Sequence, residues 1–284
     1  MMAIDPACWH HPVALATRHG KQTLIAPVLE PATGCTVVHV PEVDTDRFGT
    51  FTRDVARAGS QIEAARAKAR AALEHSGLNL ALASEGAFVT DPIAGVIPWD
   101  IEIVLLLDQA RGLEIVGLAQ GPARSGQGLA RTPDELLQLA RELGFPEHRL
   151  CLRPDHSEDP RVLKGLGAAD ALLDAFAQAL SQSARGQVFV ESDLRAHCNP
   201  TRQAMIRRAA EDLSHKMLSG CPVCGSPGFA MTGHRPGRPC RVCASATREP
   251  LAVLWSCTAC HHTEERREGM PALADPARCD RCNP

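Results

Sequence analysis

The sequence predicts an α/β protein built on a mixed sheet with flanking helices, followed by a small zinc-ribbon-like domain at the carboxyl end. Three observations support this. Up to about residue 218, short apolar runs of strand length alternate with longer segments that have helical spacing. Apolar residues make up 44% of the 284, which is enough for a real core. After that point, eight of the twelve cysteines fall into four C-x-x-C pairs.

Periodicity and capping signals place the first elements. They are a strand at 13–17, a helix at Gln22–Glu30, a strand at 35–40, a helix at 60–75, and a strand from 78 that enters a turn at Gly86. The second helix is the best defined, because Ser60 and Glu63 form a capping-box pattern and Gly77 can end the helix.

The later elements follow the same alternation. We expect strands at 101–108 and 113–119 joined by a tight turn, and then a mobile loop at 121–128. A helix from Thr132 to Gly144 and a strand at 149–154 should follow. The last expected elements are a helix in the second part of 160–182, a strand at 188–192 and a helix that starts near Pro200. The expected organisation is therefore an α/β domain at 1–195, a connecting helix at 196–218 and a zinc-binding domain at 219–284.

Hydropathy and charge limit the classes of partner. The amino-terminal segment has no apolar block typical of a signal peptide, and the longest aliphatic run, Ile103–Leu107, is too short to cross a bilayer. We expect a cytoplasmic protein with no membrane partner. From Arg195 onward there are 13 Lys and Arg against 8 Asp and Glu. Eight thiolates with two zinc ions would reduce this excess to about +1, so nucleic acid is a weakly supported partner and a protein or small molecule fits better.

The four C-x-x-C pairs predict two structural zinc sites. Zinc takes four ligands, and each pair supplies two thiolates without strain. Simple burial of cysteines does not explain four repeats of one spacing, and few large apolar side chains are present to form a core without metal. The predicted ligands are Cys221, Cys224, Cys240, Cys243, Cys257, Cys260, Cys279 and Cys282.

Which of the four C-x-x-C pairs, here called knuckles, share a zinc ion is open at this point. A predicted strand, Leu251–Trp255, suggests an inner site of Cys240, Cys243, Cys257 and Cys260 enclosed by an outer site of Cys221, Cys224, Cys279 and Cys282. Sequential pairing is the competing arrangement. His261 and His262 become ligands only if a cysteine does not bind.

The segment Thr17–Lys21 has the composition of an anion site. It joins a predicted strand to a predicted helix, whose first N–H groups favour an anion. Thr17 supplies a hydroxyl, while Arg18, His19 and Lys21 supply positive charge beside Gly20. A solvated cationic loop is the alternative.

Two charged loops could belong to the same site. In the first, Arg195, His197 and Arg202 lie together between a strand and a helix, where α/β proteins build sites. There His197 could act as acid or base and the arginines could hold an anion. In the second, residues 43–54, the charged residues Asp44, Asp46, Arg47, Arg53 and Asp54 surround Phe48 and Phe51, which could stack on a base.

Short motifs in residues 13–90 resemble those of the inosine triphosphate pyrophosphatase superfamily. The motifs are "LATRHGK", "SQIEAARAKA" and "LALASEGAF". The matching residues are Thr17, Lys21, Glu63, Lys68 and Glu85. Arg18-His19 and Ala64 stand where that superfamily has asparagine, and Ser84-Glu85 offers one carboxylate where two are common.

This resemblance implies a nucleotide substrate and a Mg²⁺ ion held by carboxylates, which activates water against a phosphoanhydride. Glu63 and Glu85 would then be catalytic, and Thr17, Lys21 and Lys68 would bind the phosphorylated ligand. Apart from the resemblance, His197 is a further candidate for catalysis, and Arg18, His19, Arg195 and Arg202 are further candidates for binding the ligand. Over its full length the chain also resembles an uncharacterised bacterial family that combines "FGTFTR", "SEG", "DLRAHCNPTR" and four C-x-x-C knuckles.

Two functions remain open from the sequence. One is a Mg²⁺-dependent nucleotide-binding or pyrophosphohydrolase-like protein. The other is a non-enzymatic adaptor whose zinc domain binds a protein or nucleic acid while the α/β part is a scaffold.

Overall fold

The structure of the protein is a computed structural model that describes residues 2–18, 20–48, 59–92 and 95–284. It contains two compact units. The α/β unit is Trp9–Ser214, and the ribbon unit combines the residues up to Cys8 with His215–Pro284. In the described part of the chain, no helix has the length and apolar character to cross a membrane.

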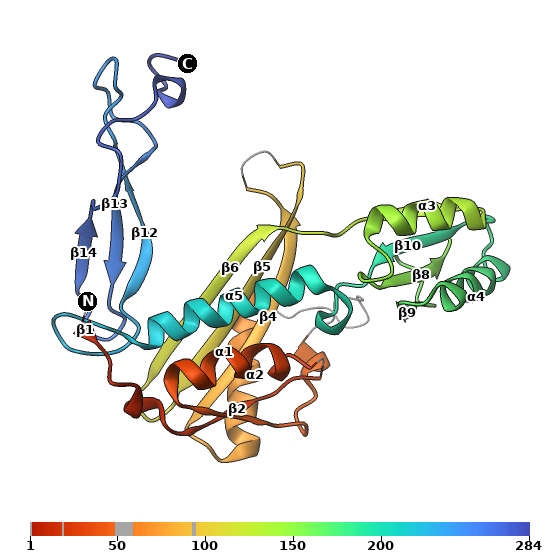
Figure 1. Cartoon of the computed structure of the whole chain (residues 1–284), viewed down its shortest axis with the longest axis horizontal. Helices are drawn as coiled ribbons and strands as arrows, with labels where there is room; N and C mark the ends of the chain where they lie inside the picture. The colour runs from red at the N-terminus through yellow and green to blue at the C-terminus, as the bar shows by residue number, and fades with distance from the viewer. Residues whose placement is uncertain (1, 19, 49–58, 93–94) are drawn as a thin grey trace. The chain divides into compact units, whose positions relative to one another are not determined.

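The first sheet of the α/β unit is mixed and has five strands in the order β3-β2-β4-β5-β6 (Figure 1). Their bounds are β2 Pro12–Leu15, β3 Thr36–His39, β4 Leu80–Thr90, β5 Pro98–Asp108 and β6 Leu113–Pro122. Strand β2 is parallel to β3 and β4, whereas β4, β5 and β6 are antiparallel. Because β2 pairs with β4 only as far as Leu15 and Leu82, the rest of β4 continues beyond the end of β2.

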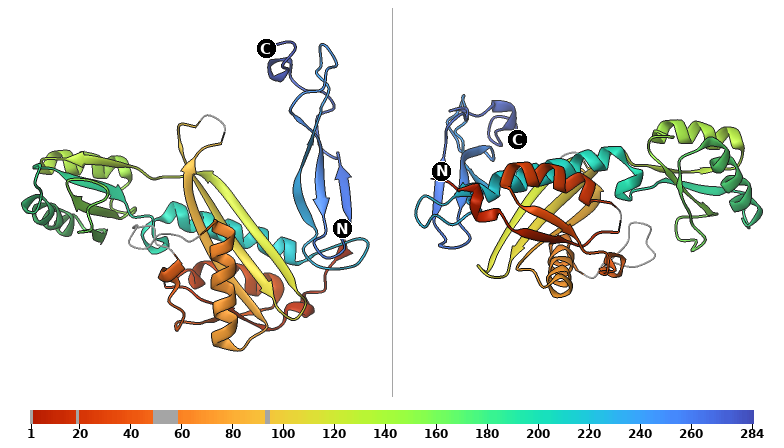
Figure 2. Two further views of the ribbon diagram at one scale, coloured as in Figure 1. Left: turned by 180° about the vertical axis from the view of Figure 1, so that it is seen from behind. Right: turned by 60° about the horizontal axis from the view of Figure 1, so that its bottom comes forward.

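Helices cover both faces of this sheet. Helix α2 (Gln61–Ser76) packs on one face, and α1 (Gln22–Thr33) and α5 (Pro200–Met217) lie on the other (Figures 1 and 2). The core under α2 is rich in alanine, including Ala65 and Ala69 against Ala83. On the α5 side, a Cβ at Gly117 would lie 2.1 Å from the Ala209 carbonyl oxygen, so glycine permits the close approach of helix to sheet.

A second, four-stranded antiparallel sheet has the order β7-β10-β8-β9. The strands are β7 Gln127–Ala130, β8 Leu150–Pro154, β9 Leu163–Leu166 and β10 Val188–Ser192. Helices α3 (Pro133–Leu143) and α4 (Ala169–Ser181) pack on it through Leu136 and Phe176. Short 3-10 helices occur at Pro6–Trp9, Thr45–Phe48, Ala196–Cys198 and Pro276–Arg278.

The ribbon unit contains a three-stranded antiparallel sheet of β12 (Ala230–Pro236), β13 (Pro250–Ser256) and β14 (Thr263–Arg266), in that order. Strands β1 (Met2–Ala3) and β11 (Ser219–Gly220) form a separate pair. In the described residues of the ribbon unit, one buried apolar cluster contains Phe229, Cys221 and Cys257, and the partly buried Trp255 packs against it. So small a core agrees with the prediction that metal stabilises this part of the chain.

The predicted α/β class is confirmed, with three corrections. The predicted turn at Gly86 is wrong, because β4 continues to Thr90 and Gly86 pairs with Glu102 inside the ladder. The predicted loop at 121–128 is shorter, since its two ends belong to β6 and β7. Strand β9, which the sequence analysis did not predict, completes a second sheet where one mixed sheet was expected.

Candidate metal centres and a buried charged site

The four cysteine knuckles share one local geometry. In the first three, the residue after the second cysteine donates its backbone N–H to the carbonyl of the first cysteine. These residues are Gly225, Ala244 and His261, with φ of 72°, 58° and 60°. In the fourth, Asn283 N donates in the same way to the Cys279 carbonyl. The repeated turn places each pair of thiols side by side.

The knuckles pair in an interleaved order. One tetrad is Cys221, Cys224, Cys257 and Cys260, and the other is Cys240, Cys243, Cys279 and Cys282. The predicted nested pairing is therefore wrong, and so is the sequential alternative. The reason is the antiparallel β12–β13 pair, in which Ala230 lies opposite Ser256. This register brings the knuckle before β12 to the knuckle after β13 and leaves Cys240 and Cys243 at the other end.

Both tetrads fit zinc. Tetrahedral zinc with bonds of about 2.3 Å separates its sulfur ligands by roughly 3.8 Å. The Sγ–Sγ distances are 3.7 Å for Cys221–Cys260 and for Cys224–Cys257, 3.8 Å for Cys240–Cys282 and 3.6 Å for Cys243–Cys279. The two tetrads therefore indicate two zinc sites. Four thiolates leave no position for a catalytic water, and neither His261 nor His262 belongs to a tetrad.

The side chain of Lys21 lies inside the protein. Lys21 precedes α1, and its Nζ donates to the Ser84 carbonyl at 3.0 Å and to Ser84 Oγ at 3.2 Å. It thus crosses the end of β2 to reach the part of β4 that β2 does not cover. Burial, together with the positive charge of Arg202, lowers the pKa of Lys21 to about 7, although Glu102 and Glu85 act in the opposite direction.

The other residues of the predicted anion loop are placed differently. Thr17 is buried, and its carbonyl lies 2.8 Å from His39 Nε2. Arg18 is exposed and pairs with Asp44 at 2.8 Å. His19 lies outside the described residues. Gly20 has φ of 68°, and a Cβ there would meet no atom within 4 Å.

On the α2 face of the sheet, Glu85 forms an ion pair with Lys68, and both side chains are buried. Gln61 lies beside this pair and donates to the Glu85 and Ile101 carbonyls, each at 2.8 Å. Glu63 has another role. It completes the capping box of α2, where the backbone and hydroxyl of Ser60 hold its pKa low. Lys68 and Glu85 therefore come together, and Glu63 points its carboxylate to the cap.

On the opposite face, Arg202 and Glu102 form a buried ion pair. Arg202 Nε donates to Glu102 Oε1 at 2.6 Å, and the two residues are 2% and 0% exposed. Arg202 also donates to the Leu194 carbonyl at 2.5 Å. A Cβ at Gly86 would lie 2.1 Å from Glu102 Oε1 and 2.6 Å from Arg202 Nη2, so the pair lies directly on the backbone of β4.

Asp100 lies two residues before Glu102 on β5 and shares its face. It is 1% exposed, and neither of its carboxylate oxygens has a hydrogen-bond partner among the described residues. Burial, followed by the charge of Glu102, raises the pKa of Asp100 to about 7. Asp100 and Glu102 were not among the site residues predicted from the sequence. The available signal was two acidic residues at alternate positions in "DIEIVLLL", an otherwise apolar segment.

The residues of the predicted charged loop with Arg195, His197 and Arg202 are divided between two groups. Arg202 joins Lys21 and Glu102. Arg195 pairs instead with Asp193 at 2.6 Å, and Asp193 also accepts a hydrogen bond from Gly165 N at 3.0 Å. His197 lies at the surface, and its pKa is lowered by the loss of part of its hydration, followed by the positive charge of Arg195. Arg195 and His197 therefore belong to a second cluster, centred on Asp193.

Only part of the predicted loop at 43–54 is described. Arg47 lies over the ring of Phe48, with 4.7 Å between the guanidinium carbon and the ring centroid. Phe48 packs against the alanine-rich core under α2. Phe51, Arg53, Asp54 and the side chain of Asp46 lie outside the described residues, and their predicted role stays a prediction.

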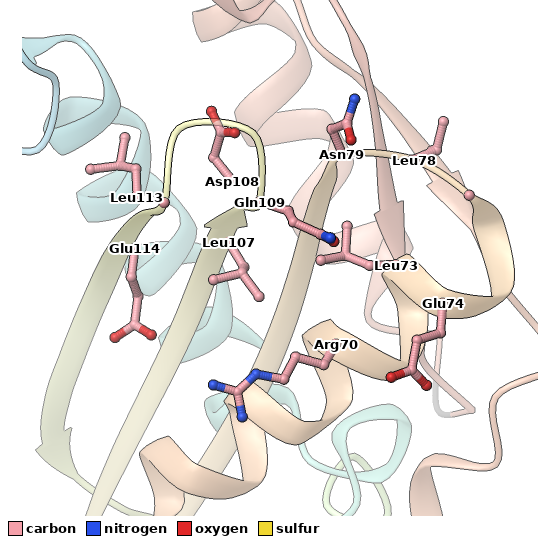
Figure 3. A pocket seen from close by; sticks show the side chains of 12 residues that line it. Arg70, Leu73, Glu74, Leu78, Asn79, Leu107, Asp108, Gln109, Leu113 and Glu114 are labelled. Atoms are coloured by element: carbon pink, nitrogen blue, oxygen red, sulfur yellow. The ribbon is translucent and has the colours of Figure 1, made fainter.

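A pocket of about 760 Å³ lies where α2 ends, at the start of β4 and the end of β5 (Figure 3). Its apolar lining includes Leu73 and Leu107, and its polar lining includes Arg70, Glu74 and Glu114. Leu80 pairs with Asp108 at this end, whereas Gly86 pairs with Glu102 further along the strands. The pocket contains none of the predicted site residues.

Fold and site together define a class of protein in which an α/β unit with a buried charged site is joined to a two-zinc ribbon. Within that class, residues 68–284 match a domain of unknown function, DUF6671, and the chain belongs to this family. The match contains Lys68, Glu85, Asp100, Glu102, Arg202 and all eight zinc-site cysteines. It does not confirm the resemblance of residues 13–90 to the inosine triphosphate pyrophosphatase superfamily. No curated protein matches the chain.

Proposed function

We propose that the α/β unit binds a phosphorylated small molecule of the nucleotide class where β2 ends, and hydrolyses a phosphoanhydride bond in it. One observation carries this proposal: the buried Lys21 lies within electrostatic reach of two buried ion pairs, Lys68–Glu85 on one face of the sheet and Arg202–Glu102 on the other, where three carboxylates are buried. The carboxylates are those of Glu85, Asp100 and Glu102. The carboxyl end of a parallel strand is also where open α/β sheets bind their ligands.

A purely structural role explains this cluster less well. Buried ion pairs contribute little net stability, because the desolvation of both charges offsets their attraction. Here the cluster also contains a lysine and an aspartic acid whose pKa values are both moved to about 7. Groups that gain and lose protons near neutral pH suit general acid–base chemistry, and burial combined with a specific charge partner is typical of active sites.

The residues around Lys21 suit a phosphate group. The backbone at Gly20 is open to a ligand, and the amino end of α1 follows directly. Lys21 and Arg202 supply positive charge that can offset the negative charge of a phosphate that enters the cluster. Arg18 lies at the surface beside the same loop and can attract the anion.

Mg²⁺ was implied by the resemblance through Glu63 and Glu85, and these two carboxylates do not fit a shared ion. The Glu63 carboxylate accepts the Ser60 backbone and hydroxyl groups, each at 2.7 Å, while that of Glu85 is paired with Lys68. Within the described ranges, only the two cysteine tetrads bring three or more metal-ligating side chains together. Mg²⁺ is therefore a variable of the assay.

The test is a panel of nucleoside mono-, di- and triphosphates, measured by thermal shift and by phosphate or pyrophosphate release with and without Mg²⁺. A ligand at 100 times its Kd should stabilise the protein by about 2.7 kcal/mol. Lys21→Met should remove the shift. Arg70→Met is the matched control, because Arg70 is exposed at the other end of β4. If no member of the panel shifts the melting temperature or is hydrolysed, the proposal fails.

A second candidate, partner binding by the ribbon unit, has one specific observation in its favour. Val223 and Val242 occupy the third position of two knuckles and are 67% and 71% exposed. Exposed apolar side chains at knuckle tips suit a protein partner better than nucleic acid. This candidate predicts that Val223→Ser with Val242→Ser abolishes cross-linking to a partner in cell extract while zinc content stays at two.

A further inference from the structure

We infer that Asp100 and Glu102 hold one proton between them, and that Asp100 gives this proton to the leaving phosphate when the phosphoanhydride bond breaks. Neither Asp100 nor Glu102 belongs to a motif that was singled out in the sequence. The catalytic role of Asp100 rests on the proposed function. The presence of the shared proton does not depend on the proposed function. It can be measured in the protein without a ligand.

The hydrogen bonds of the pair point to the proton. Glu102 Oε1 accepts from Arg202 Nε at 2.6 Å. In the described part of the chain, the other three oxygens of the pair, Asp100 Oδ1 and Oδ2 and Glu102 Oε2, are buried and have no donor. An ionised carboxylate can only accept hydrogen bonds, so two ionised groups side by side would leave all three oxygens unsatisfied. If one of the two carboxyl groups is protonated, its O–H group can donate a hydrogen bond to the other, as in other paired carboxyl groups.

The charges around the pair agree with a single proton. Arg202 faces it from α5 and Lys21 from the start of α1, and the ion pair of Glu85 with Lys68 lies on the other face of the sheet. The neighbouring strands contribute no titratable group opposite the pair, since β4 has Gly86 and Phe88 there and β6 has Ala119 and Gly121.

With one proton, the pair keeps one negative charge, which the guanidinium of Arg202 balances. The proton is placed on Asp100, because Glu102 already accepts from Arg202 and burial favours the neutral form of Asp100.

The chemical step balances with these groups alone. The oxygen of a water molecule forms a bond to phosphorus, and the bridging P–O bond breaks with its electron pair going to the leaving phosphate. The leaving oxygen takes the proton from Asp100. The proton lost by the attacking water returns to the carboxyl pair, so the enzyme ends in its starting state.

The first measurement is infrared spectroscopy of the full-length, ligand-free protein at about pH 6. We expect the carbonyl stretch of a protonated carboxylic acid, which disappears in Asp100→Asn. Asparagine can still donate to Glu102, so this variant should fold. Asp108→Asn is the control on the same strand: Asp108 accepts from Arg111 N at 3.0 Å and pairs with Arg111, so the band should remain. A native protein without the band overturns the inference.

The second measurement is turnover of a nucleotide that the panel shows to be hydrolysed. Loss of a general acid costs on the order of 10²–10⁴-fold in rate. Asp100→Asn should therefore lower kcat by that factor and remove the alkaline limb of the pH profile, while the thermal shift with the nucleotide stays. Native turnover in Asp100→Asn overturns the catalytic role. If the native protein hydrolyses nothing, the proposed function fails with it, and the infrared band alone decides on the shared proton.

Discussion

At the scale of single residues, Gly86 shows how the backbone accommodates buried charge. The ion pair of Glu102 and Arg202 lies against its Cα, in space that any side chain would occupy. The backbone at Gly86 is ordinary strand, so the need for glycine comes from this close approach and not from an unusual φ. A substitution there tests the ion pair without altering either charged residue.

We expect Gly86→Ala to destabilise the α/β unit by about 3 kcal/mol. The added methyl group would displace the Glu102 carboxylate or the Arg202 guanidinium, and disturbing a buried pair so that one charge loses its partner costs about 3–5 kcal/mol. Chemical denaturation of the full chain measures the change. Gly121→Ala on β6 is the control, because its Cβ would make an ordinary 3.6 Å contact with Met205. Equal stability of the two variants would contradict the described position of the pair.

At the scale of elements, the antiparallel β12–β13 pair decides which knuckles share a metal. The strand register places the knuckle of Cys224 beside the knuckle of Cys257, although these two cysteines are 33 residues apart in the sequence. Zinc ligation in the ribbon unit is thus a consequence of strand pairing as well as of cysteine spacing.

The interleaved pairing makes a specific prediction for a double variant. Cys224→Ser with Cys257→Ser removes two ligands from one tetrad and none from the other, so the purified protein should keep one zinc ion. Nested or sequential pairing would place the two cysteines in different sites, and both ions would be lost. Elemental analysis distinguishes the outcomes. Cys8→Ser, which changes a cysteine outside the tetrads, should leave two zinc ions per chain.

At the scale of the whole molecule, the buried cluster should give the α/β unit an unusual pH dependence of stability. The folded pKa of Asp100 is raised from 3.8 to about 7, so the folded state binds more protons between these values and stability falls as pH rises through them. The folded pKa of Lys21 is lowered from 10.5 to about 7, so the unfolded state binds more protons above pH 7 and stability recovers toward pH 10.5.

We therefore expect the contribution of this cluster to the free energy of unfolding to have a minimum near pH 7. Each group changes the free energy of unfolding by at most about 1.4 kcal/mol per pH unit. Urea unfolding of the full chain between pH 5 and pH 9 is the measurement. In a plot of the free energy of unfolding against pH, Asp100→Asn should flatten the acidic side of the minimum. Lys21→Met should flatten the alkaline side. Two variants with the same profile as the native protein would show that neither group titrates in the folded state near neutral pH.

Local patterns predicted most of the fold. The capping box at Ser60 and Glu63, the αL glycines after α2 and α3, and the cysteine spacing each depend on residues close in sequence, and each is observed. Gly86 misled the prediction because a glycine needed for close approach looks the same in sequence as a glycine needed for a turn. Strand β9 was missed because its four residues carry no periodic signal.

The candidate site was less predictable, because it depends on contacts between distant segments. Lys21, Lys68, Glu85 and Arg202 were singled out from short motifs, and the structure places Lys21 within electrostatic reach of the Lys68–Glu85 pair on one face of the sheet and of Arg202 on the other. Asp100 and Glu102 belong to the same cluster but lie in a strand that the sequence analysis treated only as core. The alternation of faces along β4 and β5 then separates Glu85 from Glu102, which a list of charged residues cannot show.

The interleaved order of the knuckles also has a consequence for how the metals are taken up. The span from Cys224 to Cys257 contains Cys240 and Cys243, and the span from Cys243 to Cys279 contains Cys257 and Cys260. When one tetrad is filled, the chain segment that the other must close is already restrained at an interior point, so less loop-closure entropy remains to be lost. Each ion thereby raises the affinity of the chain for the other, and protein with a single zinc ion should be scarce during titration.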